Sequence, residues 1–187
     1  MRLKIIRFKF LQSTNAKSIE LIGKNQLKPT IVFTKSQLNG KGTRGKKWVS
    51  IKGNIFLSIY FKIKIKNENI KQFTMLNARI LKNILQKYIK KNIHIKKPND
   101  LLIDKKKICG ILQEIVYLNN NKYIIIGIGI NTLKPILSQS FKASNLQEFT
   151  RKKINNNSII KDIKNAYELF ISDIRRYNFN YLKKKYK

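Results

Sequence analysis

Residues 37–48 read Gln-Leu-Asn-Gly-Lys-Gly-Thr-Arg-Gly-Lys-Lys-Trp, a basic stretch whose three glycines are spaced as G-x-G-x-x-G. Glycine lets a backbone turn tightly and approach a ligand closely, because it has no Cβ atom. The basic side chains supply hydrogen-bond donors and positive charge that suit phosphate or carboxylate groups. These side chains are Lys41, Arg44, Lys46 and Lys47. The stretch therefore predicts an anion-binding loop.

The residues after this loop exclude the two common nucleotide-binding folds that share its glycine spacing. A Rossmann fingerprint opens a helix at its third glycine and has an acidic residue about 20 positions later. Here Gly45 leads instead to an alternating apolar run over residues 55–63, which predicts a strand. The kinase motifs H-R-D and D-F-G are absent from the sequence. Taken alone, the loop is explained equally well as a solvated basic hairpin.

Composition is that of one globular domain. The chain has 187 residues, 42% of them hydrophobic, and no apolar run approaches the ~20 residues that span a bilayer. Charges interrupt any apolar core of a signal peptide near the N-terminus. The single cysteine, Cys109, and the single histidine, His94, exclude a disulfide framework and a metal site built from such residues. We expect one cytoplasmic domain over residues 1–187, with no membrane partner and no metal-ligating residues.

The formal net charge is +32, from 41 Lys and Arg against 9 Asp and Glu, and by itself it suggests a nucleic-acid partner. Lysine is spread through nearly every segment together with isoleucine and asparagine, and these three amino acids share A/T-rich codons. An A/T-rich genome produces such a composition without selection for a partner, so we expect no specific DNA binding. The charge still predicts attraction to acidic partners and salt-sensitive binding of polyanions.

Periodicity predicts an α+β fold with a mixed, largely antiparallel β-sheet packed against helices. Strands are expected over residues 4–10, 29–35, 54–64, 93–96, 108–118 and 122–130. Hairpin turns are expected at residues 104–107 and 119–121. Helices are expected after a cap at Ser13, from Asn69 to Tyr88, and after a cap at Asn157-Ser158. Apolar residues of the last two helices recur at helical spacing, so these helices should face the core.

Four further motifs accompany the loop. Ser13-Thr14-Asn15 precedes it, and K-x-P-N-D-L at residues 96–101, K-I-C-G-I-L-Q-E at 107–114 and G-I-G-I-N at 127–131 follow it. Each motif alone is weak evidence. In this order and at these spacings, however, the set resembles the catalytic domain of the biotin-protein ligases over residues 8–148. The resemblance implies the class II synthetase-like fold of the biotin/lipoate ligase catalytic domain.

That resemblance implies a ligase reaction in two steps. Biotin attacks the α-phosphate of MgATP to give biotinyl-5'-adenylate, and an acceptor lysine then attacks this mixed anhydride. The implied substrates are ATP and biotin, used with Mg²⁺. The implied partner is the biotin carboxyl carrier protein of acetyl-CoA carboxylase or of a related carboxylase. Neither step needs a protein nucleophile, which fits a sequence without a Ser-His or Cys-His arrangement. The resemblance leaves a monomer and a homodimer equally open.

The resemblance also assigns roles to residues of this chain. The catalytic residues are implied to be Lys96, two residues before the proline of its motif, and Arg44. Biotin is implied to contact Ser13, Thr14, Asn15, Gln37, Gly40, Lys41 and Gly110. ATP or the adenylate is implied to contact Gly42, Thr43, Arg44, Trp48, Asn99 and Asn131. Structural roles remain open for Ser13 and Thr14 as helix caps, for Trp48 as a core residue and for Asn131 as a turn residue.

This chain departs from the family pattern at two positions. Many relatives have arginine where this chain has Thr43, so we expect a weaker grip on the adenylate and its early release. The usual tryptophan is replaced by Lys97, which alters the packing of the turn but leaves Lys96 in place. Neither a helix-turn-helix segment nor the small C-terminal β domain of relatives is recognised. We therefore expect a monofunctional ligase without repressor activity and with weaker ATP binding.

Three other functions remain as alternatives. A lipoate-protein ligase shares the fold and the acyl-adenylate route, but residues 37–48 match the biotin family better and the arginine-glycine-rich lipoate signature is absent. A basic RNA-binding protein is suggested by the charge alone. A degenerate ligase that only binds biotin or a partner is disfavoured by the intact Lys96, Gly40, Gly42 and Asn131.

Overall fold

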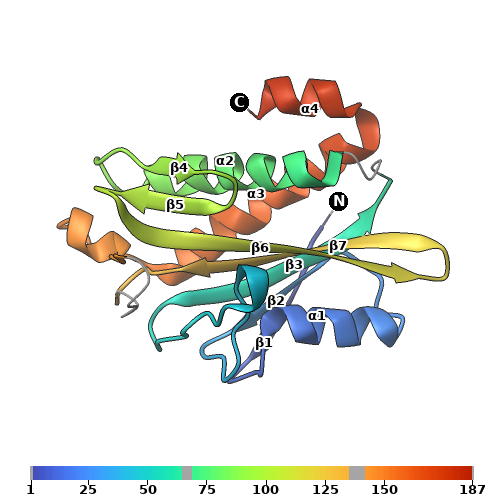
Figure 1. The fold of residues 1–187 in the computed structure, drawn as a ribbon, viewed down its shortest axis with the longest axis horizontal. Coiled ribbons are helices and arrows are strands. Elements are labelled where there is room, and N and C mark those ends of the chain that lie inside the picture. Colours follow the sequence, from blue (N-terminus) through green and yellow to red (C-terminus); the bar gives the residue numbers. More distant parts are fainter. Residues whose placement is uncertain (1, 65–68, 135–141, 187) are drawn as a thin grey trace.

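The computed structural model describes residues 2–64, 69–134 and 142–186, and its centre is a seven-stranded β-sheet (Figure 1). The strands are β1 (Lys4–Phe8), β2 (Thr30–Thr34), β3 (Ile55–Ile63), β4 (His94–Lys96), β5 (Asp100–Ile103), β6 (Lys106–Leu118) and β7 (Asn121–Ile130). The predicted strands all form, each within two residues of its predicted ends. The four-residue β5 is additional, because alternation over so short a stretch gives little signal.

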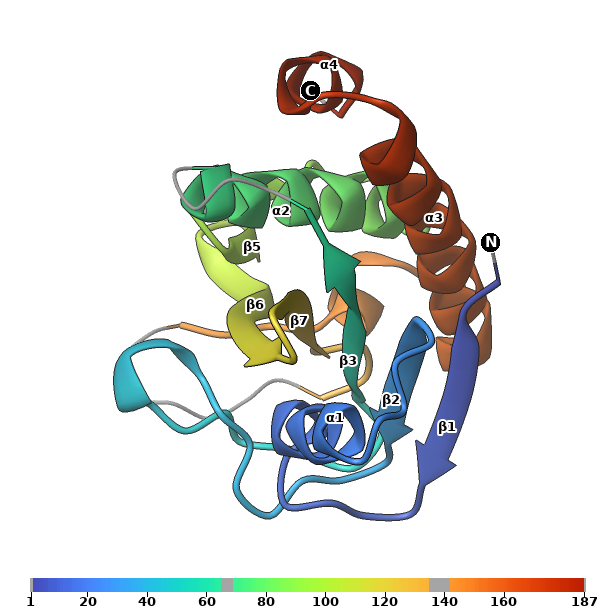
Figure 2. The same cartoon turned by 90° about the vertical axis from the view of Figure 1, so that its right-hand side faces the viewer.

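Helices cover both faces of this sheet (Figure 2). The helix α1 (Thr14–Gly23) lies on one face, and α2 (Ile70–Gln86) and α3 (Asn156–Arg176) lie on the other. A fourth helix, α4 (Phe179–Lys185), follows α3 and is not predicted from the sequence. Two short 3₁₀ helices, η1 (Thr43–Gly45) and η3 (Leu146–Phe149), lie in connecting segments. The result is a sheet enclosed between one helix and a helix pair.

The order of the strands confirms the predicted mixed and largely antiparallel sheet. Across the sheet the order is β1-β2-β3-β7-β6-β5-β4. Among the strands that the structure describes, β1 and β2 form the single parallel pair, and every other pair of neighbours is antiparallel. The central strands β3, β7 and β6 are long, and the functional motifs in β6 and β7 therefore lie side by side.

Two tight turns fix the register of the second half of the sheet, at the positions where hairpins are predicted. Asp104 and Lys105 join β5 to β6 with φ angles of 47° and 62°. Asn119 and Asn120 join β6 to β7 with φ angles of 47° and 58°. Two consecutive residues with positive φ match the twist of antiparallel strands, and asparagine tolerates this conformation well. The second turn sets Leu118 opposite Asn121 and with it every later pair of β6 and β7.

Alternation along β3 divides the core between the two faces of the sheet. Leu57 and Ile59 are fully buried in the larger cluster, which includes residues of α2 and α3. Tyr60 points to the opposite face and packs with Leu21 and Ile22 of α1. Each helix layer is therefore held by one set of alternating β3 side chains.

Helix caps agree with the sequence at α1 and differ from it at α3. Ser13 caps α1, where its hydroxyl accepts a hydrogen bond from the Ala16 N–H at 3.4 Å. The predicted cap of α3 at Asn157-Ser158 is wrong, because the Asn155 side chain accepts from the backbone N–H groups of both residues, at 2.9 and 3.3 Å. Residues 155–158 are all good capping residues, so sequence alone does not choose among them.

The cap predicted for α2 is only half right. Asn69 does hold the N-cap position, but its backbone is already helical and its side chain makes no capping hydrogen bond.

Among the described residues, no helix is long and apolar enough to cross a membrane.

An aromatic cluster joins α2, α3 and α4. The Phe170 ring stacks on Phe73 with a centroid separation of 5.2 Å. It also meets the edges of Tyr167 and Tyr186, at 6.0 and 4.9 Å. Phe170 is fully buried, so this one side chain links three helices.

We expect Phe170→Ala to lower the free energy of unfolding by about 3–5 kcal/mol, because it leaves a cavity among three other rings. Leu169→Ala is the matched control: the neighbouring side chain is 54% exposed, and its loss should change stability by less than about 0.5 kcal/mol. Chemical denaturation followed by circular dichroism measures both. Similar losses in the two variants would show that the cluster does not hold the helices together.

Candidate active site

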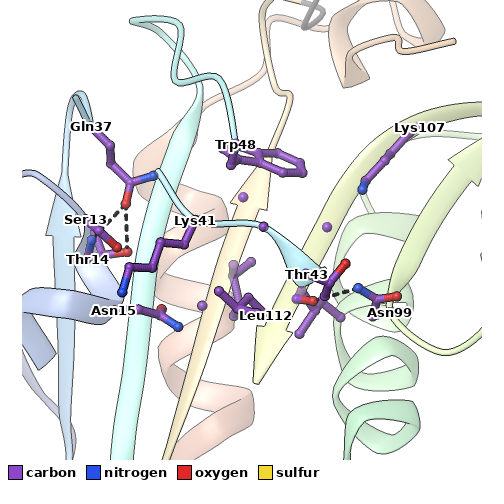
Figure 3. Close-up of a pocket in the computed structure, with 16 residues that line it drawn as sticks. Ser13, Thr14, Asn15, Gln37, Lys41, Thr43, Trp48, Asn99, Lys107 and Leu112 are labelled. Atoms are coloured by element: carbon purple, nitrogen blue, oxygen red, sulfur yellow. Dashed lines mark hydrogen bonds between the residues drawn. The ribbon is translucent and has the colours of Figure 1, made fainter. Parts of the chain in front are cut away.

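A cavity lies over the middle of the sheet, where α1, the loop over residues 37–48, β6 and β7 meet (Figure 3). Most of the predicted ligand-binding residues line it. From the predicted biotin set these are Ser13, Thr14, Asn15, Gln37, Lys41 and Gly110. From the predicted adenylate set they are Gly42, Thr43, Trp48 and Asn99. Segments more than 100 residues apart in the sequence therefore meet at one site.

A second, more open cavity adjoins the first and holds the two predicted catalytic residues. Arg44 and Lys96 line this second cavity. Thr43, Asn99 and Ile111 line both cavities, so the two are continuous along this wall. The pair of cavities suits a ligand in two parts, one enclosed and one exposed beside cationic side chains.

Lys96 is positioned by the end of a strand. It is the last residue of β4 and pairs across the ladder with Asp100, at the start of β5. Pro98 lies in the turn between these strands, which confirms the prediction that the strand stops there. The Lys96 side chain is exposed, so it can reach a ligand in the open cavity without loss of core packing.

The glycine loop is closed by its own backbone. The Trp48 N–H donates to Gly40 O at 2.8 Å, and the Gly42 N–H donates to Lys46 O at 2.6 Å. Arg44, between these contacts, has φ 55° and ψ 42°, a left-handed conformation that is strained for arginine. The Gly42 amide is thus used inside the loop in this structure, and the loop presents side chains rather than that amide to an anion.

The closed end of the first cavity is polar. Gln37 Oε1 accepts from the Thr14 N–H at 2.8 Å and lies 3.1 Å from the Thr14 hydroxyl oxygen. Gln37 Nε2 donates to Ser50 Oγ at 3.1 Å. The Thr14 hydroxyl oxygen also lies 2.7 Å from Ser58 Oγ. These contacts hold several hydrogen-bonding groups in fixed positions, where they can bind a small polar ligand.

Trp48 forms a wall of the cavity by lying flat on strand backbone. A Cβ atom added at Gly129 would meet the indole ring at 2.4 Å, and one added at Gly110 would meet it at 2.5 Å. Only glycine permits this approach. The indole Nε1–H is buried and has no hydrogen-bond partner among the described residues. Trp48 is half-buried and packs against the strands while it lines the cavity, and its contact with a ligand stays a prediction.

Lys107 completes this wall and was not among the predicted site residues. Its Nζ atom lies 5.1 Å from the centre of the Trp48 ring, within the range of a cation–π interaction. The Asp100 carboxylate pairs with the same Nζ atom at 2.7 Å, and this contact satisfies an otherwise unpartnered buried oxygen. Lys107 is thus held with its charge at the cavity.

Gly127 makes room for Asn15 in the same way. A Cβ atom added at Gly127 would lie 2.3 Å from Asn15 Oδ1. Asn15 can therefore press its amide against β7, where its Nδ2 donates to Glu114 Oε2 on β6 at 2.5 Å. In the G-I-G-I-N motif, Gly127 thus makes room for Asn15, and Gly129 makes room for Trp48.

Gly40 and Asn131 do not line the two cavities. Gly40 is buried beneath Trp48 and Gln37. The Asn131 Nδ2 donates to Ser144 O and Lys107 O, at 3.0 and 3.3 Å. Its Oδ1 is buried and has no hydrogen-bond partner among the described residues. Asn131 thus supports the backbone of Lys107 and keeps one oxygen for a further contact.

Sequence reasoning missed several lining residues besides Lys107. They are Ile111, Leu112, Gly127, Ile128 and Gly129. The hairpin turn predicted at residues 119–121 was a usable signal, because its register sets Gly110 opposite Gly129 and Leu112 opposite Gly127.

The buried thiol of Cys109 is not placed to act as a nucleophile. Burial raises the pKa of the Cys109 thiol well above its usual range, so the sulfur stays protonated. In residues 2–64, 69–134 and 142–186, no group of three or more His, Cys, Asp or Glu side chains is placed to hold a metal ion.

Comparison with known proteins agrees with this geometry. The model of the biotin/lipoate A/B protein ligase family matches residues 7–131. The chain belongs to this family. The bifunctional ligase/repressor BirA of Bacillus spizizenii is 29% identical over 181 residues, which cover 92% of this chain and 55% of that protein. The chain thus spans about half the length of the curated relatives it matches.

Solved structures show the family fold. A biotin protein ligase from Aquifex aeolicus, in complex with biotin and ATP, gives a TM-score of 0.79 at 22% identity and covers 98% of this chain and 77% of that chain. A biotin protein ligase from Leishmania major, in complex with biotinyl-5-AMP, gives a TM-score of 0.78 at 18% identity, with 98% and 79% covered. These similarities confirm the predicted fold class.

We expect Gly129→Ala to displace the Trp48 ring, because the new methyl group would lie within 2.4–2.7 Å of its atoms. Trp48 is the only tryptophan, so its fluorescence reports this change directly. Emission should move to longer wavelength as the indole becomes hydrated, and the free energy of unfolding should fall by about 1–3 kcal/mol.

The control is Gly23→Ala, since an added Cβ there meets no atom within 4 Å. It should leave the emission spectrum unchanged. A Gly129→Ala variant with the parent spectrum would show that the ring does not rest on β7.

Proposed function

We propose that this protein activates biotin as biotinyl-5'-adenylate and transfers it to a lysine of a biotin carboxyl carrier domain. The observation that carries the proposal is the continuity of the two cavities. The enclosed cavity ends in Thr14 and Gln37, and the open cavity carries Lys96 and Arg44. The first suits a small polar ring, and the second suits the phosphates of ATP. Two of the proteins with the same fold are biotin protein ligases, and this name supports the same assignment.

The biotin site is proposed to be the enclosed cavity. The cyclic urea of biotin offers N–H donors and a carbonyl acceptor, which match the hydroxyl and amide groups of Ser13, Thr14 and Gln37. Gly110 and Leu112 on β6 supply close backbone and an apolar surface for the hydrocarbon side chain. Lys41 covers the same cavity from the loop (Figure 3).

The nucleotide site is proposed to be the open cavity together with the wall of Trp48 and Lys107. Lys96, Arg44 and Lys107 place three cations around the expected position of the phosphates. Asn99, which lines both cavities, donates from Nδ2 to Ile111 O at 2.9 Å and so joins the turn to β6. Mg²⁺ is proposed to arrive with ATP and to neutralise phosphate charge there.

Catalysis then requires alignment and charge stabilisation rather than a protein nucleophile. In the first step a biotin carboxylate oxygen bonds to the α-phosphorus, and the bond from that phosphorus to the bridging oxygen of pyrophosphate breaks. In the second step the acceptor amine attacks the carbonyl carbon, AMP leaves and the nitrogen loses a proton. Lys96 and Arg44 stabilise the added phosphate charge, and the Asp100 contact holds Lys107 ready beforehand.

The partner is proposed to be the carrier domain of a carboxylase, and the whole chain is proposed to act as one catalytic domain. The net charge of +32 would attract an acidic carrier and raise the rate of association, with a strong dependence on salt. The cytoplasmic location, the absence of specific DNA binding and the monomer or homodimer state stay predictions.

We expect Lys96→Ala to reduce adenylate formation by more than about 10²-fold, because it removes a cation from the charge that develops on phosphate. The fold should persist, since the side chain is exposed. Lys62→Ala, a change of the same kind at an exposed position of β3, should keep full activity. The assay follows radiolabelled biotin with MgATP and a carrier domain.

Label on the carrier lysine that is lost with Lys96→Ala would support the proposal. Transfer of lipoate in place of biotin would move the protein to the lipoyl branch of the family. Normal adenylate formation by Lys96→Ala would contradict the role of this lysine. If the parent protein reacts with neither biotin nor lipoate, the protein is a binding module and not a ligase.

We expect Thr43→Arg to slow release of the adenylate by about tenfold, because a guanidinium can grip phosphate oxygens with two hydrogen bonds. Thr43 is exposed and lines both cavities, so the larger side chain has room. Thr43→Lys adds the same charge without the planar fork and should slow release less. Release is measured by the decay of enzyme-bound adenylate after removal of free ATP and biotin. Equal release from all three proteins would contradict a weak grip at this position.

A further inference from the structure

A chain of polar side chains runs beneath the closed end of the first cavity. It starts at the Glu114 carboxylate on β6, passes through Asn15 and Ser58, and reaches Thr14 and Gln37. Figure 3 shows Thr14, Asn15 and Gln37 of this chain. The three middle residues are at most 4% exposed, so water has little access to them. In such a buried network the direction of each hydrogen bond is set by its neighbours.

Glu114 fixes the orientation of the Asn15 amide. A carboxylate accepts hydrogen bonds and does not donate them, so the amide nitrogen of Asn15 must face Glu114, as it does at 2.5 Å. The amide oxygen must then face the other way, toward Ser58. It lies 2.5 Å from Ser58 Oγ, and because an amide oxygen has no hydrogen, the Ser58 hydroxyl donates in this contact.

The remaining hydrogens follow by counting, since a hydroxyl carries only one. The Ser58 hydrogen is used on Asn15, so in the 2.7 Å contact between Ser58 Oγ and Thr14 Oγ1 the Thr14 hydroxyl must donate. Thr14 then has no hydrogen for Gln37 Oε1, which lies 3.1 Å away. The Gln37 amide cannot turn to help, because its Oε1 accepts from the Thr14 N–H and its Nε2 donates to Ser50.

Two acceptor oxygens therefore face each other with no hydrogen between them. Both belong to residues that line the cavity, so a ligand N–H can be shared by Thr14 Oγ1 and Gln37 Oε1. We propose that Glu114 is a positioning residue that keeps both oxygens as acceptors and thereby selects a ligand ring with an N–H donor. The inference rests on the proposed function for the identity of the ring. The cyclic urea of biotin has N–H groups, and the dithiolane ring of lipoate has none.

Without a carboxylate at position 114 the chain of hydrogen bonds can reverse. A flipped Asn15 amide donates to Ser58, Ser58 donates to Thr14, and Thr14 donates to Gln37. A hydrogen then lies between the two oxygens and occupies the direction that a ligand N–H would use. Glutamine at position 114 has nearly the shape of Glu114 but can face Asn15 with either an oxygen or a nitrogen, so it permits both directions.

The test compares Glu114→Gln with the parent protein in adenylate formation, using biotin and lipoate as substrates and ATP affinity as the check on folding. The KM for biotin should rise about tenfold with kcat unchanged, the rate with lipoate should not fall, and ATP affinity should stay the same. The control is Glu20→Gln, the same change of charge at an exposed position of α1, and it should alter none of these values.

A second variant tests the route through Ser58. Ser58→Ala frees the Thr14 hydrogen for Gln37, so it should raise the KM for biotin even with Glu114 intact. Because both changes act on one chain of hydrogen bonds, the double variant should show little further loss beyond the larger single effect. Additive losses would overturn the proposal.

Three other results are decisive. A parent-like KM for biotin in Glu114→Gln overturns the positioning role and leaves the proposed function standing. If Glu114→Gln does not fold, an unchanged KM in Ser58→Ala overturns the role instead. Failure of the parent protein itself to use biotin overturns the proposed function and this inference with it.

Discussion

The register between β6 and β7 is the constraint on which the site depends. Asn119 and Asn120 close the hairpin, and from that turn the pairing continues to Gly110 opposite Gly129, beneath Trp48. A slip of one residue would put an isoleucine in place of Gly129 and would turn alternate side chains to the wrong face. The indole would lose its contact with the strands, and the first cavity would lose the wall that this ring forms.

Much of the fold follows from local signals that the sequence carries openly. The alternation in β3 and the turn at Asn119 depend on neighbours in the chain, and both appear as predicted. The parallel pairing of β1 with β2 depends on packing across distant segments, so periodicity does not reveal it. The cap of α3 was misplaced for a different reason: residues 155–158 offer four acceptable caps, and only the folded helix selects Asn155.

The site could be predicted as a set of residues but not as an arrangement. The motifs name Thr14, Gln37 and Trp48, yet their meeting at one cavity requires the sheet. Lys107 could not be predicted, because nothing in the sequence distinguishes one lysine among 41 basic residues. Its contact with Asp100, which does distinguish it, is visible only in the structure. Asn131 is predicted to contact the nucleotide, but in the structure it lines neither cavity, and its amide instead supports the backbone of Lys107.

Acidic residues are scarce in this chain, with 9 against 41 basic ones, and two of them lie at the site. Asp100 pairs with Lys107 and so holds its charge beside the Trp48 ring. Glu114 holds the amide of Asn15, which carries no charge at all. A strongly cationic protein attracts an anionic substrate without any particular residue. The direction of each donor and acceptor, however, must be fixed by specific contacts, because preorganised groups avoid reorganisation when charge develops. The carboxylates of the site thus supply order rather than charge.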